Sequence, residues 1–170
     1  FSHLRRTTHE NVDLNRNFLD FTQPLPGNPG YAELHPHLVA SWPPRVEDDA
    51  ALAAYADRHG AAALQAAVSR GQHSHPDGLF FSGTAPTWSQ QVWRRALREH
   101  AGRATRIAWI DLHTGLGPSG IGERIFACRD DAQALARARA WWGAGVTSIY
   151  DGSSTSALLQ GMAFQALYDE

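Results

Sequence analysis

The segment from Arg106 to His113 constrains the fold of this chain more than any other. Its sequence, Arg-Ile-Ala-Trp-Ile-Asp-Leu-His, is mostly apolar, has the length of a strand and is soon followed by Gly115. A short apolar run bounded by a glycine is typical of a strand buried in the middle of a sheet. We therefore expect a central strand here, with helices packed around it.

Helix and strand patterns alternate along much of the remaining chain. The alanine-rich stretch 47–70 is interrupted near His59-Gly60 and predicts two short helices. Thr87 and Gln90 form a capping-box pattern that predicts a helix to about His100. Further elements are expected as a strand at 123–128, a helix from Asp130 or Asp131 to Trp142, a strand at 146–150 and a helix that starts near Ser156. This alternation predicts an α/β fold with a mixed, largely parallel sheet sandwiched by helices.

The segment 23–44 interrupts this pattern. It carries six of the nine prolines and two glycines, which disfavour regular helix or strand, so we expect a long surface loop. At 170 residues the chain fits one domain. Because it opens at Phe1 without a methionine and stops at Glu170 inside an apparently helical stretch, we expect residues 1–170 to be an incomplete single domain from a larger protein.

The charge and composition exclude several classes of function. The net charge is only −2 with both signs interspersed, so we expect no nucleic-acid partner. All fifteen basic residues are arginine, which excludes a lysine-based phosphate loop or Schiff base and leaves arginine to bind carboxylate or phosphate. Cys128 is the only cysteine, and we expect it to be a buried small hydrophobe. Without a membrane span or a signal peptide we expect no membrane partner and a cytoplasmic location, although an export signal could precede this segment.

His113 lies where the expected central strand runs into a glycine-rich turn. In α/β sheets this carboxyl edge is where ligands bind. A histidine here can be a metal ligand, or it can simply be hydrogen-bonded at the end of a strand. A catalytic zinc site needs about three protein ligands and an open position for water, so one imidazole does not define it.

Asn15 and Arg16 follow a short strand-like segment near the start of the chain. A guanidinium group can bind a carboxylate with two parallel hydrogen bonds, and the adjacent amide adds a directional donor. Arg5 and Arg6 can place a second cation beside a carbonyl and stabilise negative charge on its oxygen. Taken alone, such residues more often have a structural role, as an arginine that ties loops together or as a solvated surface pair.

Taken together, these positions resemble the zinc carboxypeptidase family, also called funnelins, and its relatives the succinylglutamate desuccinylases and aspartoacylases. Members show an arginine, then Asp-x-Asn-Arg-Asn-aromatic, then a strand that ends in a zinc-ligand histidine, then a tyrosine near a Ser/Gly-rich turn. The matching positions here are Arg5, the run Asp13-Leu-Asn-Arg-Asn-Phe18, His113 and Tyr150. Segments 71–80 and 83–88 look like a bacterial branch of these enzymes, so the likeness spans nearly the whole chain.

The resemblance implies a role for each matched residue. Asn15 and Arg16 would bind the substrate carboxylate, His113 would be a ligand of one Zn²⁺, and Arg5 or its neighbour Arg6 would polarise the scissile carbonyl. Tyr150 would close over the bound substrate. The implied activity is zinc-dependent cleavage of an amide bond next to a free carboxylate, in a peptide or an N-acyl amino acid.

Two parts of the family pattern are missing from this sequence. The first two zinc ligands come from a His-x-x-Glu motif that should precede the carboxylate-binding residues, and no such motif occurs here. The glutamate that serves as general base should follow the tyrosine on a strand, and nothing strand-like precedes Glu170. We therefore expect both to lie outside this segment. The alternative is a non-catalytic domain that binds carboxylates or peptides.

Overall fold

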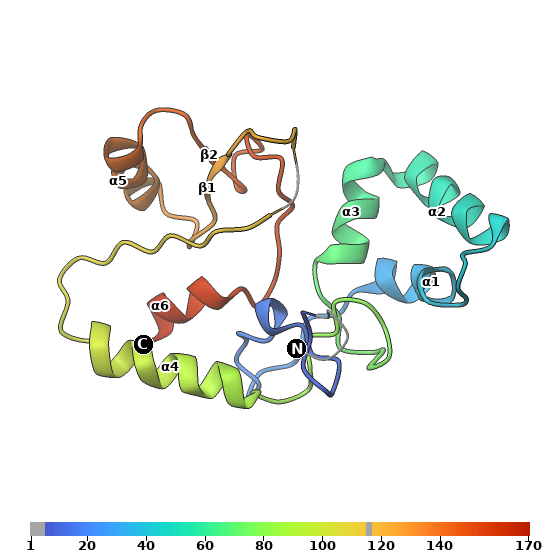
Figure 1. Cartoon of the computed structure of the whole chain (residues 1–170), viewed down its shortest axis with the longest axis horizontal. Helices are drawn as coiled ribbons and strands as arrows, with labels where there is room; N and C mark the ends of the chain where they lie inside the picture. The colour runs from blue at the N-terminus through green and yellow to red at the C-terminus, as the bar shows by residue number, and fades with distance from the viewer. Residues whose placement is uncertain (1–5, 115–116) are drawn as a thin grey trace.

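A computed structural model of the chain describes residues 6–114 and 117–170, and it combines helices with a small parallel sheet (Figure 1). In chain order the elements are η2 (Leu14–Arg16), α1 (Pro29–Leu38), α2 (Val46–His59), α3 (Ala61–Ser69), α4 (Trp88–Ala101), β1 (Arg124–Phe126), α5 (Ala132–Trp142), β2 (Val146–Ser148), η3 (Ala163–Gln165) and α6 (Ala166–Asp169). No helix within these two ranges is long and apolar enough to cross a bilayer.

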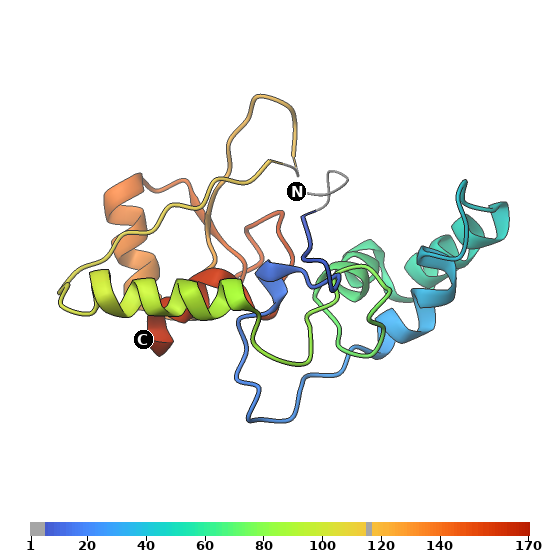
Figure 2. The same ribbon diagram turned by 60° about the horizontal axis from the view of Figure 1, so that its bottom comes forward.

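Helices α1, α2 and α3 pack together on one side of the molecule, as Figures 1 and 2 both show. Their shared core consists of Leu34, Tyr55 and Ala67, one from each helix. The expectation of two short helices within 47–70 is confirmed by α2 and α3, which meet at Gly60. Gly60 has a φ of 90°, a conformation that glycine adopts without a steric penalty, and it lets the chain turn between the two helices.

The expectation of an irregular loop over 23–44 is wrong for residues 29–38, which form α1. Pro29 occupies the first turn, where a helix needs no backbone N–H donor. The side chain of Asn28 caps this end by accepting a hydrogen bond from the Tyr31 amide at 3.0 Å. The same side chain donates to the carbonyls of Ala67 and Gly71, so α1 is held against α3. The proline content alone therefore led to the wrong prediction of an irregular loop for residues 29–38.

The small sheet and α5 form a compact strand–helix–strand unit. Strands β1 and β2 pair in parallel, with Arg124 opposite Val146, and α5 connects them. Phe126, Ala134, Ala138 and Val146 form the buried core. Cys128 packs against this core but is partly buried, whereas a buried cysteine was expected. The expected helices at 87–100 and 130–142 and the strands near 123–128 and 146–150 are confirmed, and the Thr87 and Asp131 side chains cap their helices.

The expected central strand at 106–113 does not form in the described part of the chain. This segment is extended but carries no ladder, and Ile110 and Leu112 are 70% and 91% exposed. A buried strand needs a neighbour on each edge to satisfy its backbone groups, and the described residues provide none beside it. Trp109 instead packs edge-on against Trp93 of α4, with ring centroids 5.1 Å apart. The helix expected from Ser156 is also displaced, since helical structure begins only at Ala163.

Candidate functional site

The run from Asp13 to Phe18 lies near the centre of the molecule and is mostly buried (Figure 1). Asp13 begins the short helix η2, and its Oδ1 accepts a hydrogen bond from the Asn15 amide at 3.1 Å. Among the six residues of this run, Asp13, Arg16, Asn17 and Phe18 are 6% exposed or less. We call residues 13–18 the motif segment. Polar and charged groups buried to this extent require specific partners.

Asn17 is the most heavily bonded side chain of the motif segment. Its Nδ2 donates to the carbonyls of Ser82 and Ala85 at 2.8 and 3.0 Å, and its Oδ1 accepts from the amide and the hydroxyl of Thr87, both at 2.9 Å. Gln90, in the first turn of α4, donates to the Asn17 backbone carbonyl at 2.9 Å. Asn17 therefore fixes the start of α4 against the motif segment.

Arg16 is enclosed by protein and bonded to main-chain carbonyls. Its Nε donates to Ser69 at 2.8 Å and its Nη1 donates to Asn15 at 2.7 Å. Burial lowers the pKa of Arg16 to about 10, partly offset by the charge of Asp13 and reinforced by that of Arg6. Gly71, at a φ of 109°, packs against the Arg16 stem, since a Cβ there would lie 3.1 Å from Cδ. In this conformation Arg16 ties the motif segment to the end of α3.

Arg6 presents the accessible cation beside the motif segment. Its Nη2 lies 2.7 Å from Asp13 Oδ2, and its side chain is 63% exposed. Both Arg6 and Arg16 lie over the Phe80 ring, with guanidinium carbons 5.4 and 5.2 Å from the ring centroid. We call Arg6, Asp13, Arg16 and Phe80 the arginine cluster. Two cations and one carboxylate leave this cluster with a net positive charge, so an anion approaching Arg6 would be attracted.

Asn15 faces the other end of the described chain. Its Oδ1 accepts a hydrogen bond from the Ala163 amide at 2.9 Å, and the Phe18 amide donates to the Gly161 carbonyl at 3.0 Å. Gly161 has a φ of 63°, and a Cβ at this position would overlap the backbone oxygen of Arg16. The motif segment is thus enclosed between loop 82–87 on one side and residues 161–163 on the other.

The remaining expected site residues lie elsewhere or outside the described ranges. Arg5 is outside the described residues. His113 is paired with Asp111, whose Oδ2 lies 2.9 Å from His113 Nε2, and the histidine side chain is 62% exposed. Within residues 6–114 and 117–170, no hydrogen bond or ion pair joins His113 to the motif segment. The structure brings Arg6, Asn15 and Arg16 together, and the contact that it gives His113 is the pair with Asp111.

The described residues do not complete a zinc site. No group of three or more His, Cys, Asp or Glu side chains among them is arranged to hold a metal ion. His113 offers one imidazole with a carboxylate beside it, an arrangement in which the carboxylate usually orients the ring for metal binding by the other nitrogen. About three protein ligands are needed, so the ligand set is incomplete and we assign no chemical step to the metal.

Tyr150 packs in the strand–helix–strand unit. Its ring lies against the core of Phe126, Ala134, Ala138 and Val146, and its hydroxyl donates to the Cys128 carbonyl. Burial raises the pKa of Tyr150. This tyrosine is therefore tied down in the described conformation, and closing over a substrate would require the Cys128 hydrogen bond to break.

A family model described as "Protein of unknown function (DUF2817)" matches residues 1–170. The chain belongs to the DUF2817 family. That description states no activity. Searches of curated proteins and of solved structures found no match.

In this DUF2817 chain the structure adds a cavity that sequence reasoning missed. It lies beside the motif segment, between residues 19–22 and α4, and has a volume of about 460 Å³. Three arginines of α4 line it, Arg94, Arg95 and Arg98. Their spacing in a helix expected from the sequence could have revealed a basic face, since residues three and four positions apart on a helix are neighbours, as Arg95 and Arg94 are to Arg98. We call this cavity the arginine pocket.

Proposed function

We propose that the protein is a zinc-dependent hydrolase of the carboxypeptidase-like class. Its substrate would carry a free carboxylate next to the scissile amide bond, as in a peptide or an N-acyl amino acid. The observation that carries the proposal is the ordered series of Asp13 to Phe18, His113 and Tyr150, which resembles the funnelin pattern over most of the chain. The central, buried position of the motif segment supports the importance of this series.

The proposal assigns the carboxylate of the substrate to the arginine cluster. Arg6 is the most suitable first contact, because its guanidinium group is exposed while Asp13 holds it in place. Asn15 and Arg16 would take part only if the loops around them open, since Arg16 now bonds two main-chain carbonyls and Asn15 bonds Ala163. Arg5 stays a proposed polarising group on the resemblance alone.

The zinc ion of this proposal would use His113 as one ligand, with its ring oriented by Asp111. The other ligands and the general base are implied by the resemblance to lie outside this segment. The same resemblance carries the finer proposals of a larger, mainly parallel sheet sandwiched by helices, in which 106–113 would be paired on both edges, and of a cytoplasmic enzyme. A paired strand would bury Ile110 and Leu112, which are now exposed.

The experiment is hydrolysis of a panel of C-terminally free peptides and N-acyl amino acids by the intact protein supplied with Zn²⁺. We expect turnover that His113→Ala abolishes. His100→Ala, which removes an exposed histidine of α4, is the matched control and should leave turnover unchanged. If the intact protein neither binds zinc nor cleaves any member of the panel, the proposal fails.

A non-catalytic carboxylate-binding domain is the second candidate. It is favoured by the exposed guanidinium of Arg6 beside residues that do not complete a metal site. Isothermal titration calorimetry with an N-acyl amino acid separates the two candidates. Binding that depends on Arg6 or Arg16, is unaffected by a chelator and leaves the ligand intact supports the binder, whereas zinc-dependent loss of the ligand supports the hydrolase.

A further inference from the structure

The arginine pocket carries a concentration of positive charge that the proposed function does not use. Arg94, Arg95 and Arg98 all come from α4, while Asp20 is the acidic residue of the lining. The Asp20 carboxylate is already occupied, because its Oδ1 accepts from the Thr22 amide at 2.9 Å and from the Thr22 hydroxyl at 2.6 Å. The residues that line the pocket therefore carry more positive than negative charge, and guanidinium groups suit an anionic ligand. In this conformation Asp169 and Glu170 offset that excess.

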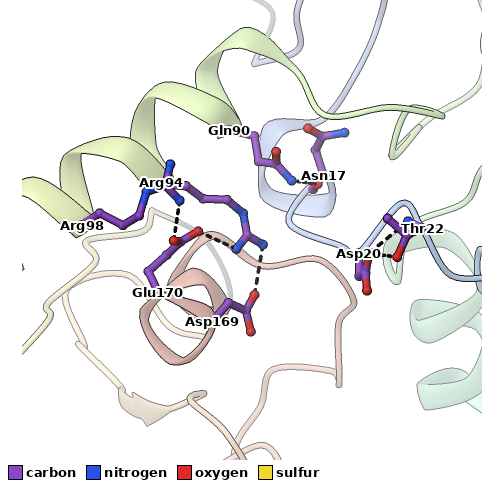
Figure 3. Close-up of polar contacts among 8 residues, drawn as sticks. All are labelled: Asn17, Asp20, Thr22, Gln90, Arg94, Arg98, Asp169 and Glu170. Carbon is purple, nitrogen blue, oxygen red and sulfur yellow. Dashed lines mark hydrogen bonds and ion pairs between the residues drawn. The ribbon is translucent and has the colours of Figure 1, made fainter. Parts of the chain in front are cut away.

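Two of these arginines already hold carboxylates of the same chain, as Figure 3 shows. Arg94 binds Asp169 through Nη2 at 3.0 Å and Glu170 through Nη1 at 3.1 Å, and Arg98 binds the second oxygen of Glu170. Burial raises the pKa of Glu170, but hydrogen bonds from Arg98 and Arg94 outweigh burial and lower it overall. Two neighbouring carboxylates are thus bound, ionised, beside the pocket.

The third arginine provides binding capacity that these carboxylates leave unused. Arg95 is exposed, lines the cavity and makes no hydrogen bond or ion pair within the described parts of the chain. The ion pair of Asp169 with Arg94 is also weakly held, since the Asp169 side chain is 44% exposed and such surface ion pairs contribute little to stability. Glu170 is only 12% exposed and bonds both Arg94 and Arg98, so it is held more firmly. An external anion could therefore bind Arg95 and displace Asp169 from Arg94, and it would displace Glu170 at a greater cost.

We propose that the arginine pocket binds a small dicarboxylate, and that Asp169 and Glu170 compete with this ligand for Arg94 and Arg98. The pair Asp169 and Glu170 shows which groups the guanidinium groups of Arg94 and Arg98 bind, namely two carboxylates separated by a short link. Leu19, Phe21 and Pro86 supply an apolar part of the cavity wall that suits a methylene linker. The proposal does not rest on the proposed hydrolase, because the pocket contains none of the residues assigned to it.

The test is calorimetric titration of the intact protein with glutarate as the probe. We expect saturable binding that Arg95→Gln weakens about tenfold, the loss of one charge-assisted hydrogen-bonding group. The double variant Asp169→Asn/Glu170→Gln should bind more tightly than the wild type, because the competing carboxylates are gone. Arg137→Gln is the matched control, since Arg137 is an exposed arginine of α5 away from the pocket.

Each outcome of this titration decides the proposal. Binding by the double variant alone would support it, because the acidic pair would then cover the site in the wild type. Absence of binding by both proteins would overturn it, as would glutarate binding that Arg95→Gln leaves unchanged or that Arg137→Gln weakens equally. Tighter binding of inorganic phosphate than of glutarate would overturn the assignment to dicarboxylates. Circular dichroism confirms that each variant is folded, and Arg95→Gln breaks no contact within the described residues.

Discussion

Replacing Asn17 by alanine should destabilise the protein more than any other single side-chain truncation in the motif segment. Asn17 is fully buried, and its amide group makes four hydrogen bonds that join the motif segment to loop 82–87. Alanine would leave the buried carbonyl of Ser82, the part-buried carbonyl of Ala85 and two part-buried donors of Thr87 without this partner. The cap that starts α4 would lose its support at the same time.

The size of the effect follows from the cost of unpaired polar groups. A buried donor or acceptor that loses its partner costs about 1–3 kcal/mol. Because water can enter the space left by the amide and satisfy some of these groups, we expect a total of about 3–5 kcal/mol rather than the full sum. This is a large share of the roughly 5–15 kcal/mol by which native proteins are stable.

Urea denaturation of the intact protein, followed by circular dichroism, measures the free energy of unfolding. Asn15→Ala is the matched control, because it removes the same side chain two residues away, where it makes one hydrogen bond to Ala163. We expect Asn15→Ala to cost about 1 kcal/mol. A loss in Asn17→Ala within about 1 kcal/mol of this control would refute the central structural role of the Asn17 amide.

Three further predictions follow from the same structure. Gly161→Ala should lower the free energy of unfolding by about 3 kcal/mol, because the added Cβ would overlap the Arg16 carbonyl. Gly152→Ala is the control, since Gly152 has a similar φ but open space around it, and it should cost about 1 kcal/mol. Equal losses of stability in urea denaturation would contradict the close approach of Gly161 to Arg16. Hydrogen bonds from Arg45 and His37 lower the pKa of Asp48, so its contribution to stability is present above about pH 4 and is lost as the pH falls further. Urea midpoints between pH 3 and 7 should therefore fall less steeply in Asp48→Asn, and an unchanged slope would refute this contribution of the Asp48 carboxylate. Elemental analysis of the intact protein should find at least tenfold weaker zinc retention in His113→Ala than in His100→Ala, because the loss of a protein ligand lowers the affinity for zinc. Equal zinc contents in the two variants would count against His113 as a ligand.

The elements that the sequence predicted are those decided by local chemistry. Helices α2, α3, α4 and α5 follow from alanine content, apolar spacing and the Thr87 and Asp131 caps, all of which act within a few residues. Helix α1 was missed because a proline count ignores position. Pro29 sits where a helix tolerates proline, and Asn28 caps the helix by accepting from the Tyr31 amide. Asn28 also donates to the carbonyl of Ala67, 39 residues away, a contact that no local pattern predicts.

The segment 106–113 is the opposite case, because the sequence predicted a strand that the structure does not form. Its residues satisfy the pattern of a buried strand, but a strand also needs partners that its own sequence does not supply. Within the described residues the only ladder is that of β1 and β2, so this apolar run is left extended on the surface. A periodicity argument identifies a segment that can be a strand, and tertiary context decides whether it is one.

Some features of the candidate site could also be predicted from the sequence, and others could not. The run Asp13 to Phe18 could be recognised from sequence, and so could the basic character of Arg6 and Arg16. Its contacts with Ser82, Thr87 and Ala163 could not, because they join residues 65 to 148 positions apart. The burial of Arg16 is a consequence of these distant contacts, which is why its accessibility could not be judged from the motif.

The measurement that tests the central claim most directly is a crystal structure of the intact protein grown with Zn²⁺, with diffraction data collected at the zinc absorption edge. The account predicts an anomalous peak about 2.0–2.1 Å from an imidazole nitrogen of His113, with an opening that leads from it to Arg6. A zinc peak bound by other residues, or saturating zinc without a peak near His113, would contradict the proposed hydrolase.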